Sequence, residues 1–165
     1  MKTPHLLCIG SCALDRTWMS NSRILAHASN PGRMESSAGG VAYNVAADIT
    51  NLGVQTDLIA AFGGDHDGDW LRGECLRRNI GLSHAVTLPD QTTASYLAVL
   101  DDSGDLYVGI AAMAIVDNLT PDKLPQNLPQ ADAAFIEANL PEATIGALLE
   151  ILVPRMPVYG GTVSP

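Results

Sequence analysis

Paired glycines at positions 39 and 40 stand directly before residues with the apolar spacing of a helix. A helix N-terminus presents free N–H groups and the positive end of the helix dipole, and glycine lets a ligand approach the backbone. The pair is therefore a candidate site for hydroxyl groups or an anion, and a tight turn into a packed helix is the alternative. Neither Gly-Lys-Ser/Thr nor GxGxxG accompanies the pair, which argues against a Walker loop and a dinucleotide fingerprint.

Asp15 and Asn44 are the polar residues that we expect beside these glycines. Asp15 follows a short apolar run that predicts a buried strand, and Asn44 lies in the first turns of the helix after Gly40. In an α/β sheet, the carboxyl ends of strands and the following helix N-termini meet at one edge, where ligands bind. The sequence therefore predicts a small-molecule site that includes both side chains.

Three aspartates at positions 65, 67 and 69 imitate the start of a calcium-binding EF-hand loop. Such a loop requires Gly at its sixth position and Glu at its twelfth, where this chain has Trp70 and Leu76. Calcium binding is therefore excluded, and Asp67 or Asp69 is expected to cap the helix that begins near Trp70. The four histidines show no ligand spacing, so no metal site is predicted, and no nucleophile–base pair can be recognised.

The composition predicts one acidic globular domain. The chain has 165 residues, of which 47% are hydrophobic and 16% charged, and its net charge is −9. This charge disfavours binding to nucleic acid or to an anionic membrane surface, since both require clustered Lys and Arg. Three cysteines without CxxC spacing predict buried thiols in a reducing compartment, and the apolar run before Cys12 is too short for a signal peptide. We therefore expect a cytoplasmic protein.

Strand and helix patterns alternate along the chain, which predicts an α/β sheet. A β-hairpin is expected at 95–110, and the polar stretch 16–35 is expected to be irregular with a turn at 30–32. Strands are expected at 6–9, 57–62, 133–136 and from 157, and helices at 41–52, 70–79, 121–124 and 141–152. No helix follows the last strand, so we expect an exposed sheet edge that promotes self-association.

Several of these segments, in this order, resemble the N-terminal half of ribokinase-like (PfkB-family) carbohydrate kinases. The segments are Ile9-Gly10 with Asp15, Gly39-Gly40-Val41-Ala42-Tyr43-Asn44-Val45-Ala46, Leu52-Gly53, and Phe62-Gly63-Gly64-Asp65 with Gly68. Within the family, the chain is most similar to pseudouridine kinases at Thr93-Ala94-Ser95-Tyr96-Leu97-Ala98-Val99-Leu100-Asp101, Gly104-Asp105, Glu137-Ala138-Asn139-Leu140 and Thr162-Val163-Ser164.

The resemblance implies a three-layer α/β/α sheet with a small β lid, in one incomplete domain spanning 1–165. It places lid segments at about 16–30 and 93–111 and ends the chain before the C-terminal nucleotide-binding half. It implies ATP-dependent phosphorylation of a sugar hydroxyl, with a pseudouridine-like sugar or nucleoside as substrate, and association of copies through the lid or the exposed sheet edge. The implied substrate contacts are Asp15, Gly39, Gly40, Asn44 and Glu137. A carboxylate and an amide can together bind vicinal hydroxyls.

The chain departs from the family pattern in three ways. The Gly-Ala-Gly-Asp motif, which carries the catalytic base and phosphate site, is absent, and we expect the ATP and Mg²⁺ sites to be absent with it. Ala112-Met113 stands where pseudouridine kinases have Asp-Met, and Gly161 where relatives have an aspartate. The leading hypothesis is therefore a substrate-binding half that is inactive alone. The alternatives are a non-catalytic nucleoside-binding or sugar-binding module and an oligomerising remnant.

Overall fold

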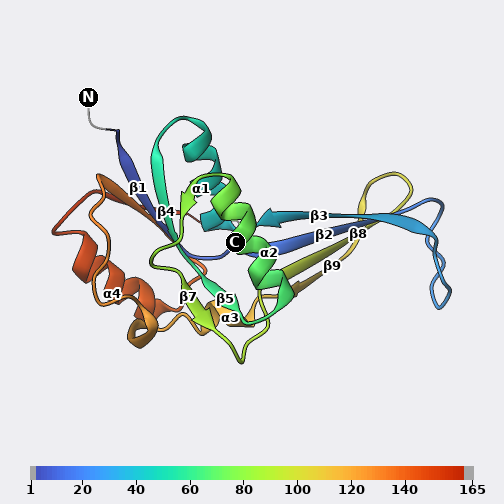
Figure 1. Cartoon of the computed structure of the whole chain (residues 1–165). Coiled ribbons are helices and arrows are strands. Elements are labelled where there is room, and N and C mark those ends of the chain that lie inside the picture. The colour runs from blue at the N-terminus through green and yellow to red at the C-terminus, as the bar shows by residue number, and fades with distance from the viewer. Residues whose placement is uncertain (1–2, 162–165) are drawn as a thin grey trace.

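The computed structural model describes residues 3–161, and its centre is a five-stranded parallel sheet (Figure 1). Strand β1 is short, apolar and buried, and it pairs with β4 on one side and β10 on the other. The order across the sheet is β11 (Val158–Gly161), β10 (Ala133–Glu137), β1 (His5–Ile9), β4 (Gln55–Ile59) and β6 (Ile80–Gly81).

Helices cover both faces of this sheet. Because successive side chains of a strand point to opposite faces, Cys8 of β1 enters one core, whereas Leu7 and Ile9 enter the other. The first core includes α1 (Val41–Asn51) and α2 (His66–Arg77), and the second includes α3 (Ala114–Asp117) and α4 (Glu142–Leu152). A 3₁₀ turn, η1 (Pro121–Lys123), lies between α3 and β10. The expected three-layer α/β/α fold is confirmed.

A second sheet of four strands extends away from this body, and we call it the lid (Figure 1). Its central strands β2 and β8 are parallel, and each has an antiparallel neighbour at the edge. The order is β3 (Gly32–Gly39), β2 (Ala13–Ser20), β8 (Ser95–Leu100) and β9 (Leu106–Ala112). A small parallel pair, β5 (Ala61–Gly63) with β7 (Val86–Leu88), completes the strands.

The expectation that 16–35 is irregular is wrong, because most of this stretch is strand. β2 and β3 pair over eight positions, from Ala13 opposite Gly39 to Ser20 opposite Gly32. β3 is an edge strand and almost wholly exposed, so its polar residues lack the apolar alternation that marks a half-buried strand. The lid is consequently larger than the segments 16–30 and 93–111, since it also contains β3.

The helix predicted after Gly40 is confirmed, but its buried face consists of three alanines and one tyrosine. Its buried residues are Ala42, Tyr43, Ala46 and Ala47, whereas Leu52 at its end is 78% exposed. Gly53, at φ +84°, follows as the expected helix stop. Among the described residues, no helix is both long and apolar enough to cross a membrane. The Thr-Val-Ser segment at 162–164 lies outside the described residues.

Candidate functional site

An open pocket of about 470 Å³ lies where the carboxyl ends of β1 and β10 meet the N-terminus of α1 and the lid. The chain leaves β1 toward β4 on one side and later returns to β10 on the other, so this point is the topological switch of the sheet. The pocket is lined by Ser11, Asp15, Gly40, Val41, Asn44, Tyr96, Ala111, Met113, Val116, Glu137 and Asn139. Four of the five expected contact residues therefore line one cavity.

Glu137, at the end of β10, is buried and bonded to the start of α1. Its Oε2 accepts hydrogen bonds from Ser11 N at 2.6 Å, Ser11 Oγ at 2.7 Å and Ala42 N at 3.3 Å, and its Oε1 accepts one from Asn139 Nδ2 at 3.2 Å. A Cβ on Gly10 would lie 2.5 Å from this carboxylate, so only glycine permits the approach. Glu137 thus fixes β1, β10 and α1 relative to one another.

The N-terminus of α1 is closed to an anion, contrary to one of the sequence hypotheses. Val41 N donates to Ser11 Oγ at 3.0 Å, Tyr43 N donates to Ser11 O at 3.1 Å, and Ala42 N is bonded to Glu137. These protein groups occupy the N–H groups that a phosphate would need, and the Glu137 carboxylate already lies at the positive end of the helix dipole. The site is therefore suited to uncharged hydroxyl groups.

Asp15 enters the pocket from the lid. It stands opposite Ser37 of β3 and Tyr96 of β8, so these side chains form one row across the lid. A Cβ on Gly39 would overlap the Asp15 carboxylate, which explains the glycine at this position. Gly39 itself, unlike the other four expected contact residues, does not line the pocket. Burial raises the pKa of Asp15 above its ordinary value, so ionising this carboxyl is less favourable in the ligand-free pocket than in water.

Gly40 and Asn44 form the rim of the pocket on the side of α1. Gly40 has φ +97°, and a Cβ there would lie 2.7 Å from Ser11 O, so the chain enters the helix only through glycine. Asn44 N donates to Gly40 O at 2.9 Å, which places the Asn44 side chain one turn into the helix. The amide of Asn44 and the carboxylate of Asp15 thus line the same pocket from α1 and the lid.

The pocket also has an apolar side, which sequence reasoning missed. It consists of Tyr96, Ala111, Met113 and Val116. Gly109 leaves room for the Tyr96 ring, because a Cβ there would overlap the phenol oxygen. Alternation along β8 could have placed Tyr96 on the same face as Asp15, but only with the strand register known. Met113, part of one departure from the family pattern, lines this side, whereas Ala112 does not.

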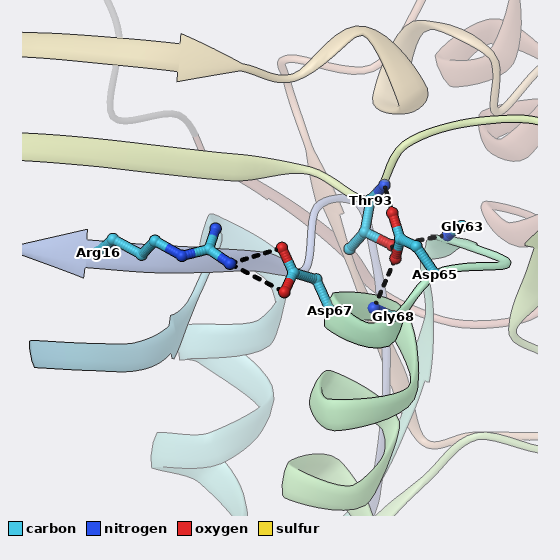
Figure 2. Close-up of polar contacts among 6 residues, drawn as sticks. All are labelled: Arg16, Gly63, Asp65, Asp67, Gly68 and Thr93. Carbon is cyan, nitrogen blue, oxygen red and sulfur yellow. Dashed lines mark hydrogen bonds and ion pairs between the residues drawn. The ribbon is translucent and has the colours of Figure 1, made fainter.

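A second polar cluster holds the start of α2 (Figure 2). It lies on the face of the lid opposite the pocket, where Arg16 points. Asp65 is the helix cap: its Oδ1 accepts from Gly68 N at 2.9 Å, and its carboxylate also accepts from Thr93 N and Thr93 Oγ1. The prediction that Asp67 or Asp69 caps this helix is wrong, because α2 begins at His66, a full turn before its apolar pattern. Asp67 instead pairs with Arg16 of β2.

The residues of the pocket do not fit a nucleoside triphosphate or its metal. Two carboxylates, Asp15 and Glu137, face the cavity, and no Lys or Arg is among the lining residues. Within residues 3–161, no group of three or more His, Cys, Asp and Glu side chains could hold a metal ion. We therefore derive no step through ATP or Mg²⁺ from these residues. The fold and the pocket define an α/β domain with an open, partly polar pocket beneath a β lid.

Comparison with known proteins identifies the family. Residues 3–152 match the pfkB family of carbohydrate kinases. The chain is 28% identical over 163 residues to a pseudouridine kinase of Escherichia coli (strain K12), which covers 97% of this chain and 52% of that protein. It is 26% identical over 120 residues to a fructokinase of Salmonella typhimurium, covering 73% of this chain and 34% of that protein. This chain belongs to the pfkB family of carbohydrate kinases.

The solved structures agree with this assignment. A carbohydrate kinase from Agrobacterium tumefaciens is similar with a TM-score of 0.88 and 29% sequence identity, over 96% of this chain and 53% of that one. The chain therefore spans about half the length of this structure and of the pseudouridine kinase. The family phosphorylates small sugar or nucleoside substrates, so ATP and a divalent metal are expected of it in general.

Proposed function

We propose that this chain is the substrate-binding half of a nucleoside kinase, with a pseudouridine-like molecule as ligand. The observation that carries the proposal is the pocket with two chemically different sides. Asp15 and Asn44 are suited to the hydroxyls of a sugar, and Tyr96 with Met113 and Val116 forms an apolar wall for a flat base. A bare sugar would leave this wall without a partner, so we favour a nucleoside over a free sugar.

Charge favours a ligand without phosphate. A sugar phosphate would meet the carboxylates of Asp15 and Glu137, and the N–H groups at the start of α1 are already bonded. Phosphoryl transfer depends on cations or helix N-termini around the phosphates. The pocket provides neither, and we propose that ATP, Mg²⁺ and the catalytic base act from residues beyond those described, so that this chain alone binds without transfer.

The experiment is calorimetric titration of the 165-residue chain with pseudouridine, uridine, ribose, fructose and fructose 6-phosphate. We expect saturable binding of a nucleoside, weaker binding of ribose and none of fructose 6-phosphate. Asp15→Ala should weaken binding by about tenfold or more, since a hydrogen bond with a charged group contributes about 1.5–3 kcal/mol. Asn44→Ala should weaken it by about 2-fold to 10-fold, since a neutral hydrogen bond contributes about 0.5–1.5 kcal/mol. Asp48→Ala, which changes an exposed residue of α1, is the matched control. Binding that none of these variants changes would contradict the proposal.

Two alternatives remain as outcomes of the same work. ADP release with ATP, Mg²⁺ and a nucleoside would show that this chain transfers phosphate alone, contrary to the proposal. Absence of binding to every member of the panel would favour the oligomerising remnant.

We also propose that copies associate through the lid. Its edge strand β9 exposes Leu106, Tyr107, Val108 and Ile110, each by more than 40%, and such apolar surface is typical of an interface. Sedimentation should detect association that Ile110→Glu abolishes, and a monomeric wild-type chain at high concentration would contradict it. The three cysteines are buried and free, which supports the expected cytoplasmic location.

A further inference from the structure

Two consecutive residues of β2 face two different helices, and one of them is bonded to its helix. Because neighbouring side chains of a strand point to opposite faces, Asp15 faces the pocket and Arg16 faces α2. Nη2 of Arg16 donates to both carboxylate oxygens of Asp67, at 2.9 and 2.8 Å (Figure 2). Arg16 thus holds β2 on the face that points to α2, and its neighbour in the chain is Asp15, which lines the pocket.

Asp67 is a rigid partner because the first turn of α2 is fixed. Asp65 accepts hydrogen bonds from Gly68 N, Thr93 N and Thr93 Oγ1, and Thr93 Oγ1 in turn accepts one from Gly63 N at 2.9 Å. Thr93 is 1% exposed and lies two residues before β8, the neighbour of β2. The same turn of α2 therefore holds the root of β8 through a buried network and β2 through the ion pair.

The two attachments differ in exposure. The side chains of Arg16 and Asp67 are 32% and 27% exposed, so this pair is open to water, whereas Thr93 is enclosed. A pair of this kind adds little to global stability, but the contact of Nη2 with both carboxylate oxygens fixes where Arg16 lies against α2. We propose that the Arg16–Asp67 pair is a positioning contact, which sets the lid against the body so that Asp15 reaches the ligand; its effect on binding rests on the proposed function.

The test compares Arg16→Gln, Arg16→Lys and Asp67→Asn with the control Arg33→Gln. Arg33 lies in the same sheet and approaches Glu35 at 4.0 Å, with side chains 61% and 81% exposed. In calorimetry with pseudouridine, we expect the first three variants to weaken binding by between about 2-fold and 30-fold, which is the range for residues that affect a site without touching its ligand. Arg16→Lys should show the smallest loss of the three, because a single ammonium can contact both carboxylate oxygens as Nη2 does, although from a shorter side chain. Wild-type affinity in all three would overturn the proposal.

A measurement without ligand keeps this inference separate from the proposed function. Burial raises the pKa of Asp15, and carboxyl NMR can follow that pKa in each variant. Loosening the lid admits water, so Arg16→Gln and Asp67→Asn should both lower it, and the control should not. If the pKa of Asp15 instead rises in Arg16→Gln and falls in Asp67→Asn, the changes report only the lost cation and the lost anion. That result would overturn the proposal.

Stability provides the remaining check. We expect the melting temperature of each variant to stay within about 4 °C of the wild type, as for loss of a part-exposed ion pair. A much larger fall would show a general structural role and overturn the positioning role. If the wild-type chain binds no member of the nucleoside panel, the proposed function fails, while the pKa of Asp15 still decides the role of Arg16.

Discussion

The N-termini of α1 and α2 face the lid from opposite sides, and they are stabilised in different ways. α2 is capped by its own Asp65 and carries Asp67 and Asp69 in its first turn. α1 has Gly40 at its cap and no acidic residue in its first turn, and it depends on Ser11 and on Glu137 from β10. Asp65 directly precedes α2 in the sequence and caps this helix, whose first turn is bonded to the lid. α1 is held instead by Ser11 and Glu137, which are distant in the sequence, and its own Gly40 and Asn44 line the pocket.

Glu137→Ala removes the distant residue that holds the start of α1, and of the variants considered it should lower stability the most. Removing the carboxylate leaves the N–H groups of Ser11 and Ala42 buried without a partner, at about 1–3 kcal/mol each. We expect the free energy of unfolding to fall by about 3 kcal/mol and nucleoside binding to be lost. Denaturant unfolding measures the first effect, with Glu150→Ala, an exposed change in α4, as control. Glu137→Gln keeps one acceptor oxygen, and a loss equal to that of Ala would contradict the hydrogen-bond account.

Asp65→Ala should have a smaller effect on stability. Loss of the cap and of its bonds to Thr93 should lower the free energy of unfolding by about 1–2 kcal/mol at pH 7. The exposed Asp69, in the same turn, provides the control Asp69→Ala. Equal losses in both variants would show that charge at the helix end, and not the cap, is responsible.

The contribution of Asp65 should also depend on pH. Burial alone would raise the pKa of Asp65, but hydrogen bonds from Thr93 and Gly68 outweigh burial and hold it below its ordinary value of 3.8. A lowered pKa stabilises the fold above the unfolded pKa, and this stabilisation disappears as the pH falls through the folded pKa. The stability difference between wild type and Asp65→Ala should persist from pH 7 to about 4 and shrink below that. A difference that instead grows in acid would contradict the account.

Asp15→Asn should have the smallest effect on stability, and of opposite sign. Because burial raises the pKa of Asp15, its ionised form opposes folding at neutral pH, so the amide should slightly increase the melting temperature while weakening nucleoside binding. Its stability advantage over the wild type should vanish as the pH falls below the ordinary pKa of a carboxyl group. Asp48→Asn on the exposed side of α1 is the control, and a destabilised Asp15→Asn would show that this carboxylate is structural.

The two helix ends also show which features could be predicted from the sequence. The body strands and helices have short apolar runs or helical spacing, and Gly40 and Asn44 follow directly from the local pattern. The sequence pattern indicates the wrong aspartate as the cap of α2, because the polar first turn of this helix precedes its apolar pattern. It gives no sign of β3, because an exposed edge strand needs no apolar alternation.

The features that could not be predicted depend on pairing across long sequence distances. Ser11 and Glu137 are 126 residues apart, and the row that joins Asp15 to Tyr96 exists only once the register of β2 and β8 is set. Glu137 is predicted as a site residue by the family resemblance alone, and nothing in its local sequence indicates a role at the start of α1. Local patterns thus predicted elements, whereas the chemistry of the pocket results from how the sheet brings them together.

The central claim is that a neutral nucleoside binds at the carboxyl edge of the sheet, between α1 and the lid. Amide NMR during titration with pseudouridine tests it most directly. We predict saturable shifts at Gly40, Asn44 and Tyr96. Shifts confined to the second cavity, lined by Gln130, Ala131, Asp132, Arg155 and Met156 at the amino ends of β10 and β11, would contradict the claim, as would no shift at millimolar ligand.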